Sequence, residues 1–153
     1  MFRGRLIDCY TQNWHDTINN SSRCHHYCQY KSLLNIERYL SLELPIKYKI
    51  AFAKFRCSNH KLFIETGRHY SIPLHERICN FCLQNYNMSF IECEFHAFFH
   101  CRKYTHIRNE YLSTWYNSGT ELDNFYELMA TNDDTTIRKL SVYIFHLMNC
   151  IKD

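Results

Sequence analysis

Two short stretches, Cys79-Asn-Phe-Cys82 and His96-Ala-Phe-Phe-His100-Cys101, decide how this chain of 153 residues folds around its centre. The two thiols of the first stretch stand two residues apart, so a tight turn can point both sulfurs at one metal ion. After thirteen intervening residues, an imidazole and a third thiol can complete a tetrahedral site of the Cys₃His type. The spacing therefore predicts one structural Zn²⁺ on Cys79, Cys82, His96 and Cys101.

Spacing alone leaves the fourth ligand open. His96 and His100 are four residues apart and share a face of a continuous helix, which allows a rival Cys₂His₂ set. His96 and Cys101 are five residues apart, or about 500° of helical rotation, so Cys101 can ligate only if the helix ends near His100 and the chain turns. Cys93, three residues before His96, is a further candidate. The chain has nine cysteines, and buried thiols without a metal are also common.

The amino-acid composition favours a helical protein with a hydrophobic core. Apolar residues make up 46% of the chain, which is enough for a core in one domain of this length. Only three Gly and two Pro are present, so few positions interrupt helices. We expect an all-α, irregular helical domain with an embedded zinc-binding turn-plus-helix module. The parts of this single domain, residues 1–153, are N-terminal helices over 1–70, the zinc module over 71–104 and C-terminal helices over 105–153.

Apolar residues at spacings of three and four predict where the helices lie. The clearest stripe runs along the C-terminal segment and includes Leu140, Ile144 and Leu147. Helices are expected at residues 3–18, 29–43, 45–56, 59–67, 91–99, 103–115, 120–129 and 133–152.

Side-chain patterns also predict how one helix faces the core. Pro45 suits the first turn of its helix, because the N–H that proline lacks is not needed there. The side chains then expected to face inward are Ile46, Ile50 and Ala53, with Phe52 and Phe55 as further candidates, and those expected to face outward are Lys47, Lys54 and Arg56.

Two other helix ends carry recognisable signals. Gly67 suits the position that follows the last turn of a short helix. Thr120 and Asp123 resemble the reciprocal capping pair that begins a helix.

The net charge of +3 conceals an uneven distribution. Residues 1–78 hold twelve Lys and Arg against six Asp and Glu, whereas residues 79–153 hold six against nine. The basic excess is concentrated in residues 46–77 and suits a polyanion such as RNA or DNA, although an ordinary solvated surface has a similar composition. The candidate nucleic-acid contacts are Lys54, Arg56, Lys61, Arg68 and Arg77.

Membrane and export signals are absent from the sequence. No apolar run reaches the roughly 18–20 residues of a membrane helix. The first ten residues lack the apolar segment of a secretory signal. An odd number of cysteines without such a signal fits a reducing compartment, in which thiols bind metal or stay free. We expect an intracellular monomer, in the nucleus or the cytoplasm, that does not bind membranes.

Three segments, residues 56–68, 76–82 and 91–101, resemble the C-terminal zinc-binding region that follows reverse transcriptase in LINE-type, non-LTR retrotransposons. They read Arg-Cys-Ser-Asn-His-Lys-Leu-Phe-Ile-Glu-Thr-Gly-Arg, Glu-Arg-Ile-Cys-Asn-Phe-Cys and Ile-Glu-Cys-Glu-Phe-His-Ala-Phe-Phe-His-Cys. The resemblance covers roughly residues 8–150. It favours Cys101 as the last ligand, because the family pattern ends with a cysteine after H-x4.

The sequence departs from that family at two positions. The family usually has an acidic residue at the position of Cys93 and a proline at the position of Arg102. The proline would help to stop the ligand helix, so its absence weakens the expected turn.

The resemblance implies an accessory module that helps a reverse transcriptase hold its RNA or target DNA. The chain lacks the Tyr-x-Asp-Asp motif of the polymerase, so it corresponds to a fragment or a remnant of such a polyprotein. A protein-interaction zinc module remains an alternative to nucleic-acid binding.

An enzyme of the Cys/His class is the other alternative, and we do not expect one. Such an enzyme needs an activated thiol, an orienting third group and an oxyanion site, and none can be identified in the sequence. Four protein ligands would also leave no open position for water, which catalytic zinc keeps. The segment Cys24-His-His-Tyr-Cys28 is not expected to hold a second metal ion, because its four side chains cannot reach one ion from a helix without strain.

Overall fold

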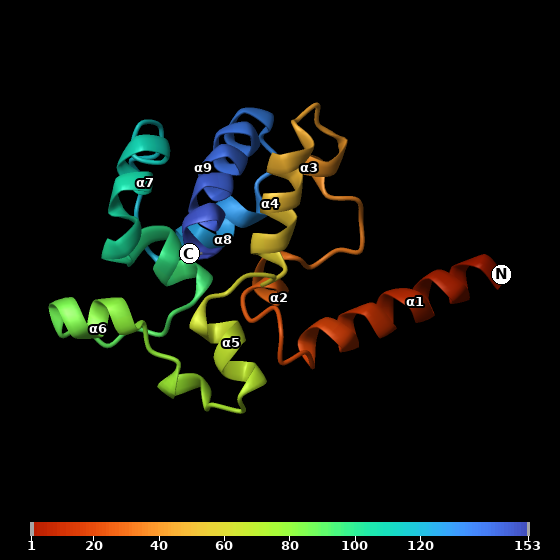
Figure 1. Cartoon of the computed structure of the whole chain (residues 1–153). Coiled ribbons are helices and arrows are strands. Elements are labelled where there is room, and N and C mark those ends of the chain that lie inside the picture. Colours follow the sequence, from red (N-terminus) through yellow and green to blue (C-terminus); the bar gives the residue numbers. More distant parts are fainter. Residues whose placement is uncertain (1, 153) are drawn as a thin grey trace.

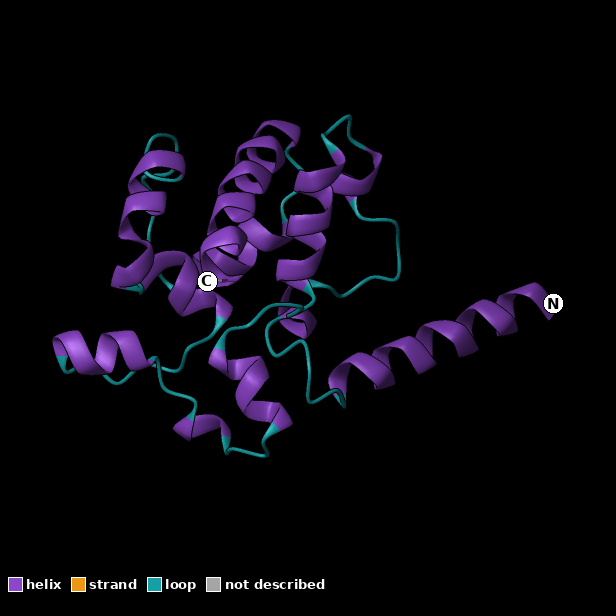
Figure 2. Ribbon diagram, viewed as in Figure 1, coloured by secondary structure: helices purple, strands orange, loops and turns teal. Residues whose placement is uncertain are grey.

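The chain folds into helices and connecting loops, drawn in purple and teal in Figure 2, in a computed structural model that describes residues 2–152. Within that range the only paired extended backbone is an antiparallel bridge between Ile78 and Ile91. The all-α prediction is therefore confirmed. In chain order the elements are α1 (Phe2–Asn19), α2 (Tyr27–Tyr30), α3 (Arg38–Ser41), α4 (Ile46–Arg56), α5 (Phe63–His69), η1 (Leu74–Glu76), α6 (Asn80–Tyr86), η2 (His96–His100), η3 (Arg102–Tyr104), α7 (Thr105–Tyr111), α8 (Leu122–Ala130) and α9 (Asp134–Lys152).

Helices α9 and α4 form the centre of the core. Leu140, Ile144 and Leu147 of α9 are fully buried, because their spacing places them on one face of the helix. Helix α4 lies against α9 and adds the buried rings of Phe52 and Phe55 (Figure 1). The predicted C-terminal helix is thus confirmed.

The segment between α6 and α7 is anchored in the same core by Phe98 of η2. The ring centroid of Phe98 lies 4.8 Å from that of Tyr143 and 5.4 Å from that of Phe125, both edge-to-face. The Tyr143 hydroxyl donates a hydrogen bond to the carbonyl oxygen of Phe98 at 2.6 Å. Movement of η2 would therefore disturb the core.

The predicted helix over residues 29–43 is wrong, because α2 and α3 are two single turns joined by irregular chain. Lys31 explains the break. Its buried amino group donates to the backbone and side-chain oxygens of Asn35 and pairs with Glu37 at 3.0 Å. Ile36, whose spacing suggested a helix, is 81% exposed. Between α2 and α3 the chain therefore follows the polar contacts of the buried Lys31 and does not form the predicted helix.

Helix α4 turns a different side to the core from the predicted one. Ile46 and Ile50 are 69% and 47% exposed, whereas Arg56 is only 4% exposed. The guanidinium of Arg56 lies 2.8 Å from a carboxylate oxygen of Glu37 and covers the ring of Tyr30. The predicted outward orientation of Arg56 is therefore wrong, because a carboxylate and aromatic rings surround its guanidinium in the core.

Two predicted helix ends are shifted. Helix α8 is capped by Glu121 and Asn124, one residue after the predicted pair Thr120 and Asp123. Gly67 lies inside α5 rather than after it. Both errors come from assigning an end from one or two residues, since helix ends depend on contacts outside the helix.

Helix α1 projects from the rest of the molecule and meets it beside α2 (Figure 1). The predicted helix over residues 3–18 is confirmed. Leu6, Ile7 and Tyr10 of this helix are each more than half exposed. Among the helices of residues 2–152, none is long and apolar enough to cross a membrane.

Candidate metal centre

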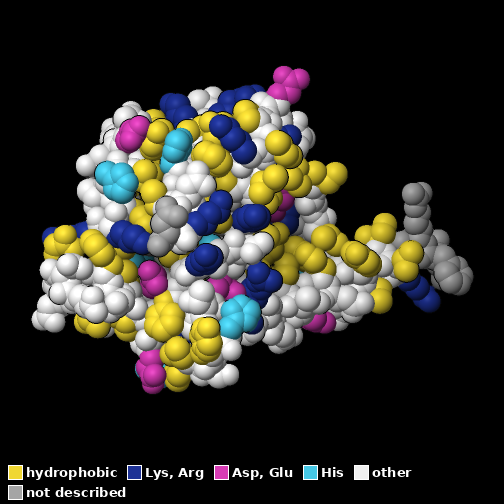
Figure 3. All heavy atoms as spheres, in the orientation of Figure 1, with side chains coloured by type: hydrophobic (Ala, Val, Ile, Leu, Met, Phe, Trp, Pro, Cys, Tyr) yellow, Lys and Arg dark blue, Asp and Glu magenta, His cyan; other side chains and the backbone are white. Residues whose placement is uncertain are grey.

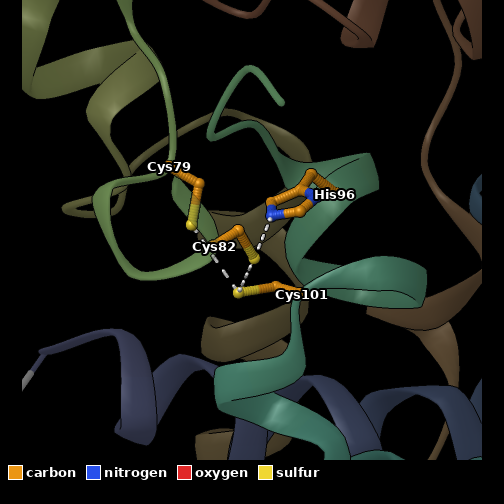
Figure 4. Close-up of side chains that lie close together, drawn as sticks. All are labelled: Cys79, Cys82, His96 and Cys101. Atoms are coloured by element: carbon orange, nitrogen blue, oxygen red, sulfur yellow. Dashed lines mark hydrogen bonds between the residues drawn. The ribbon is translucent and has the colours of Figure 1, made fainter. Parts of the chain in front are cut away.

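Cys79, Cys82, His96 and Cys101 meet in one buried cluster (Figure 4). The Sγ atom of Cys101 lies 3.8 Å from the Sγ atoms of both Cys79 and Cys82. The Sγ atom of Cys82 lies 3.4 Å from Nε2 of His96. All ligand atoms are within 4.8 Å of one another, so the four side chains could hold one metal ion. Across residues 2–152 they form the only such group of three or more Cys, His, Asp or Glu side chains.

The first two ligands stand at the N-terminal end of α6. Cys79 precedes the helix and Cys82 lies in its first turn. The backbone N–H of Cys79 donates to the carbonyl oxygen of Phe90 at 2.8 Å, which closes the loop that follows α6. Cys82 is the one fully buried side chain of residues 80–86, and α6 otherwise projects away from the core (Figure 1). The cluster is thus the main attachment of this helix.

A widened helical turn brings His96 and Cys101 together. Residues 96–100 form a π-helix, in which the N–H of Cys101 donates to the carbonyl oxygen of His96 at 2.7 Å, five residues back. The helix then ends, and Cys101 has an extended backbone with ψ of 120°. A regular α-helix would have rotated the two side chains apart. The turn that ligation by Cys101 requires is therefore present after His100.

Hydrogen bonding and burial shift the pKa values of the three thiols in different directions. A hydrogen bond from Cys101 is the main reason that the pKa of Cys79 is lowered, and the same contact raises the pKa of Cys101. Burial raises the pKa of Cys82. Of the three thiols, Cys79 is therefore the one whose thiolate the surrounding protein favours. A bound cation would allow all three sulfurs to lose their protons.

The two rival ligands lie outside the cluster. Nε2 of His100 donates to the carbonyl oxygen of Thr120 at 3.1 Å, and the ring is exposed. Cys93 is buried, and burial raises its pKa to about 11, which keeps the thiol protonated. Cys101, rather than His100 or Cys93, completes the set.

A second buried polar cluster, which the sequence analysis missed, fastens the start of the η2 turn to the loop after α4. Glu94 is 2% exposed and accepts hydrogen bonds from Oγ of Ser58 and, at 2.8 Å, from Nε2 of His60. Burial raises the pKa of Glu94, but its hydrogen bond and charge interaction with His60 outweigh this effect and lower the pKa to about 2. Nε2 of His26 lies 3.9 Å from the same carboxylate, and burial lowers the pKa of His26 to about 4.

The five basic side chains predicted to contact nucleic acid differ in their surroundings. Lys54 and Lys61 are exposed. Arg68 pairs with a buried carboxylate at 3.2 Å. Arg77 donates to two backbone carbonyl groups at 2.8 Å each. The expected exposure of Arg56 is wrong, because the core encloses its guanidinium, so Lys54 and Lys61 are the two that face solvent most freely.

No family model, no curated protein and no solved structure matches this chain. The resemblance to the retrotransposon region therefore rests on the sequence motifs alone. The buried Cys₃His cluster and its geometry are seen in the structure and do not depend on that resemblance.

Proposed function

We propose that the chain is a zinc-stabilised accessory module that binds RNA or DNA, like the LINE-type region that it resembles. The geometry of the Cys₃His cluster supports the zinc site of this proposal, and the resemblance and the exposed lysines support the nucleic-acid binding. Around a tetrahedral zinc ion, bond lengths near 2.3 Å to sulfur and 2.0–2.1 Å to nitrogen separate two sulfurs by about 3.8 Å and a sulfur from a nitrogen by about 3.6 Å. Three of the six ligand–ligand distances in the cluster are 3.8, 3.8 and 3.4 Å, and all six are within 4.8 Å. Thiolate and imidazole ligands in a tetrahedral set are typical of zinc.

The proposed zinc is structural rather than catalytic. Four protein ligands fill a tetrahedron, so no position is left for a water molecule that the metal could activate. Three thiolates, one neutral imidazole and a divalent ion sum to a charge of −1. The module therefore has no chemistry of its own under this proposal.

Exposed lysines supply the proposed nucleic-acid contacts. Lys54 and Lys61 are in none of the ion pairs formed among residues 2–152, so their ammonium groups remain available to phosphates. Contacts of this kind are weak and largely independent of nucleotide sequence. The resemblance adds a reverse transcriptase as the protein that such a module would assist.

Charge reversal of both lysines is expected to make nucleic-acid binding weaker and less sensitive to salt. Each phosphate contact adds about −0.7 to −0.9 to the slope of log affinity against log salt concentration. The variant with Lys54→Glu and Lys61→Glu should therefore have a slope that is shallower by about 1.4–1.8. Fluorescence anisotropy of labelled single-stranded RNA and DNA across a potassium chloride series measures this slope.

The matched control is Lys139→Glu, which reverses an exposed lysine beside Trp115. It should leave the slope unchanged. If the wild-type protein fails to bind either nucleic acid at low salt, the protein-interaction alternative becomes the better account of the exposed lysines.

A further inference from the structure

A groove between α4 and α9 combines an apolar floor with a rim of lysines and has a volume of about 210 Å³. We propose that this lysine groove holds single-stranded nucleic acid, with a base on the floor and phosphates on the rim; the inference rests on the nucleic-acid binding proposed above. The floor consists of Ile50, Ala51, Phe145 and Met148, and the rim of Lys47, Lys54 and Lys152.

The lysines bracket the floor at both of its ends. Lys47 and Lys54 are seven residues apart on α4, or about 10 Å along the helix axis. Nζ of Lys47 lies 5.1 Å from the ring centroid of Phe145. Helices α4 and α9 run in the same direction (Figure 1), so Lys152, seven residues after Phe145, reaches the end of the groove that Lys54 occupies. Phosphates on either side of a base can thus meet an ammonium group.

The floor is formed by the outer edge of the core, where Ala51 and Met148 are buried, together with the exposed side chain of Ile50. Ile50 is 47% exposed, because α4 turns Phe52 and Phe55 inward instead. Phe145 is only partly buried and has the ring of Tyr48 edge-to-face against it at 5.2 Å. Figure 3 shows Lys and Arg side chains gathered on the face over α4 and the end of α9. An aromatic ring and aliphatic groups framed by cations are typical of sites that stack unpaired bases.

The charges in the groove are not neutralised within the described chain. Among residues 2–152, Lys47, Lys54 and Lys152 form no ion pair. Nζ of Lys152 donates to the amide oxygen of Asn149 at 3.3 Å, which leaves its charge in place. The groove is therefore complementary to a polyanion.

The dimensions of the groove favour a single strand over two other polyanions. A duplex hides the faces of its bases and would leave the apolar floor unused. An acidic amphipathic helix inserts anchors at i, i+3, i+4 and i+7 into a groove, and a volume of about 210 Å³ is too small for four such side chains. The volume is also below the roughly 300 Å³ at which pockets for whole small molecules begin.

The test compares oligo(dT) with an abasic oligomer of the same length and with duplex DNA, at fixed salt, using the full chain. Base contact on the floor predicts that the wild-type protein binds oligo(dT) at least about five-fold more tightly than the abasic strand, since stacking contributes about 1 kcal/mol or more per base. Ile50→Gln should bring this ratio close to one and leave the affinity for the abasic strand unchanged. Ile36→Gln alters an isoleucine away from the groove that is more exposed, at 81% against 47% for Ile50, and should preserve the ratio.

Equal affinity of the wild-type protein for oligo(dT) and the abasic strand would overturn the groove proposal while leaving charge-based binding intact. An unchanged ratio in Ile50→Gln would also overturn the groove proposal. So would displacement of the abasic strand and of oligo(dT) by poly-glutamate to the same extent. Absence of binding to all three oligomers would instead refute the proposed function itself. Circular dichroism of Ile50→Gln, whose side chain is half exposed, confirms that the variant is folded.

Discussion

Removal of the metal with EDTA is expected to unfold residues 79–90, which carry Cys79, Cys82 and helix α6, while α9 stays helical. Cys82 is the one fully buried side chain of α6, and the other contacts of that helix, made by Phe81 and Tyr86, are only partly buried or exposed. Binding free energies of structural zinc in small modules reach about 10–16 kcal/mol at neutral pH, and they are free energies of folding for the segment that carries the ligands. Helix α9 should survive, because its buried face packs against α4.

Near-UV circular dichroism, limited proteolysis and amide hydrogen exchange measure this separation. Cleavage should appear within residues 79–90 after chelation, and the amides of α9 should stay protected. Addition of excess zinc should restore the original spectrum. An unchanged spectrum and cleavage pattern, in protein shown by elemental analysis to have lost its metal, would contradict a structural role.

Replacement of Glu94 by alanine is expected to lower the free energy of unfolding by about 3 kcal/mol or more. The substitution leaves Ser58 and His60 buried without the carboxylate that accepts their hydrogen bonds. The native pKa of Glu94 is about 2, below its ordinary value, so the native state favours the carboxylate. This contribution is fully present above about pH 4.5, which is near the unfolded value, and is lost as the pH falls toward 2.

Urea denaturation at neutral pH, with zinc in excess, measures the loss, and thermal unfolding should show a decrease of about 6–12 °C. The control Glu127→Ala removes an exposed carboxylate from α8 and should change stability by less than about 0.5 kcal/mol. Glu94→Gln retains an acceptor oxygen and should lose less than the alanine variant. If Glu94→Ala is no more destabilising than Glu127→Ala, the buried cluster does not support η2 as described.

Local patterns in the sequence were sufficient for α9 and for the first three ligands. The stripe that contains Leu140, Ile144 and Leu147 lies within one helix, and its spacing alone defines the buried face. Cys79 and Cys82 lie within a single turn, where spacing alone brings both sulfurs to one point. Both features depend on neighbours along the chain.

The choice of the fourth ligand depends on a backbone feature that spacing does not encode. The hydrogen bond of the π-helical turn reaches back five residues, from Cys101 to His96, instead of the four of a regular α-helical turn. The turn also directs His100 toward Thr120. On a regular α-helix, His100 would share a face with His96 instead. The residues alone therefore permitted both sets, and the turn decides between them.

The remaining errors concern residues whose partners are distant in sequence. Glu94 meets Ser58 and His60, which are 36 and 34 residues away, so no local pattern indicates this cluster. Arg56 is buried because Glu37, from the irregular chain before α3, pairs with it. The burial of that arginine accompanies the exposure of Ile50, on which the proposed groove depends.

Elemental analysis of reduced, freshly purified protein tests the central claim most directly, when it is applied to the wild type and two variants. We expect one zinc ion per chain in the wild-type protein and in His100→Ala, because His100 lies outside the cluster. Cys101→Ser should lose the zinc, because Cys101 supplies the sulfur that lies 3.8 Å from both other thiols. Absence of zinc from the wild-type protein, or full retention in Cys101→Ser together with loss in His100→Ala, would contradict the account.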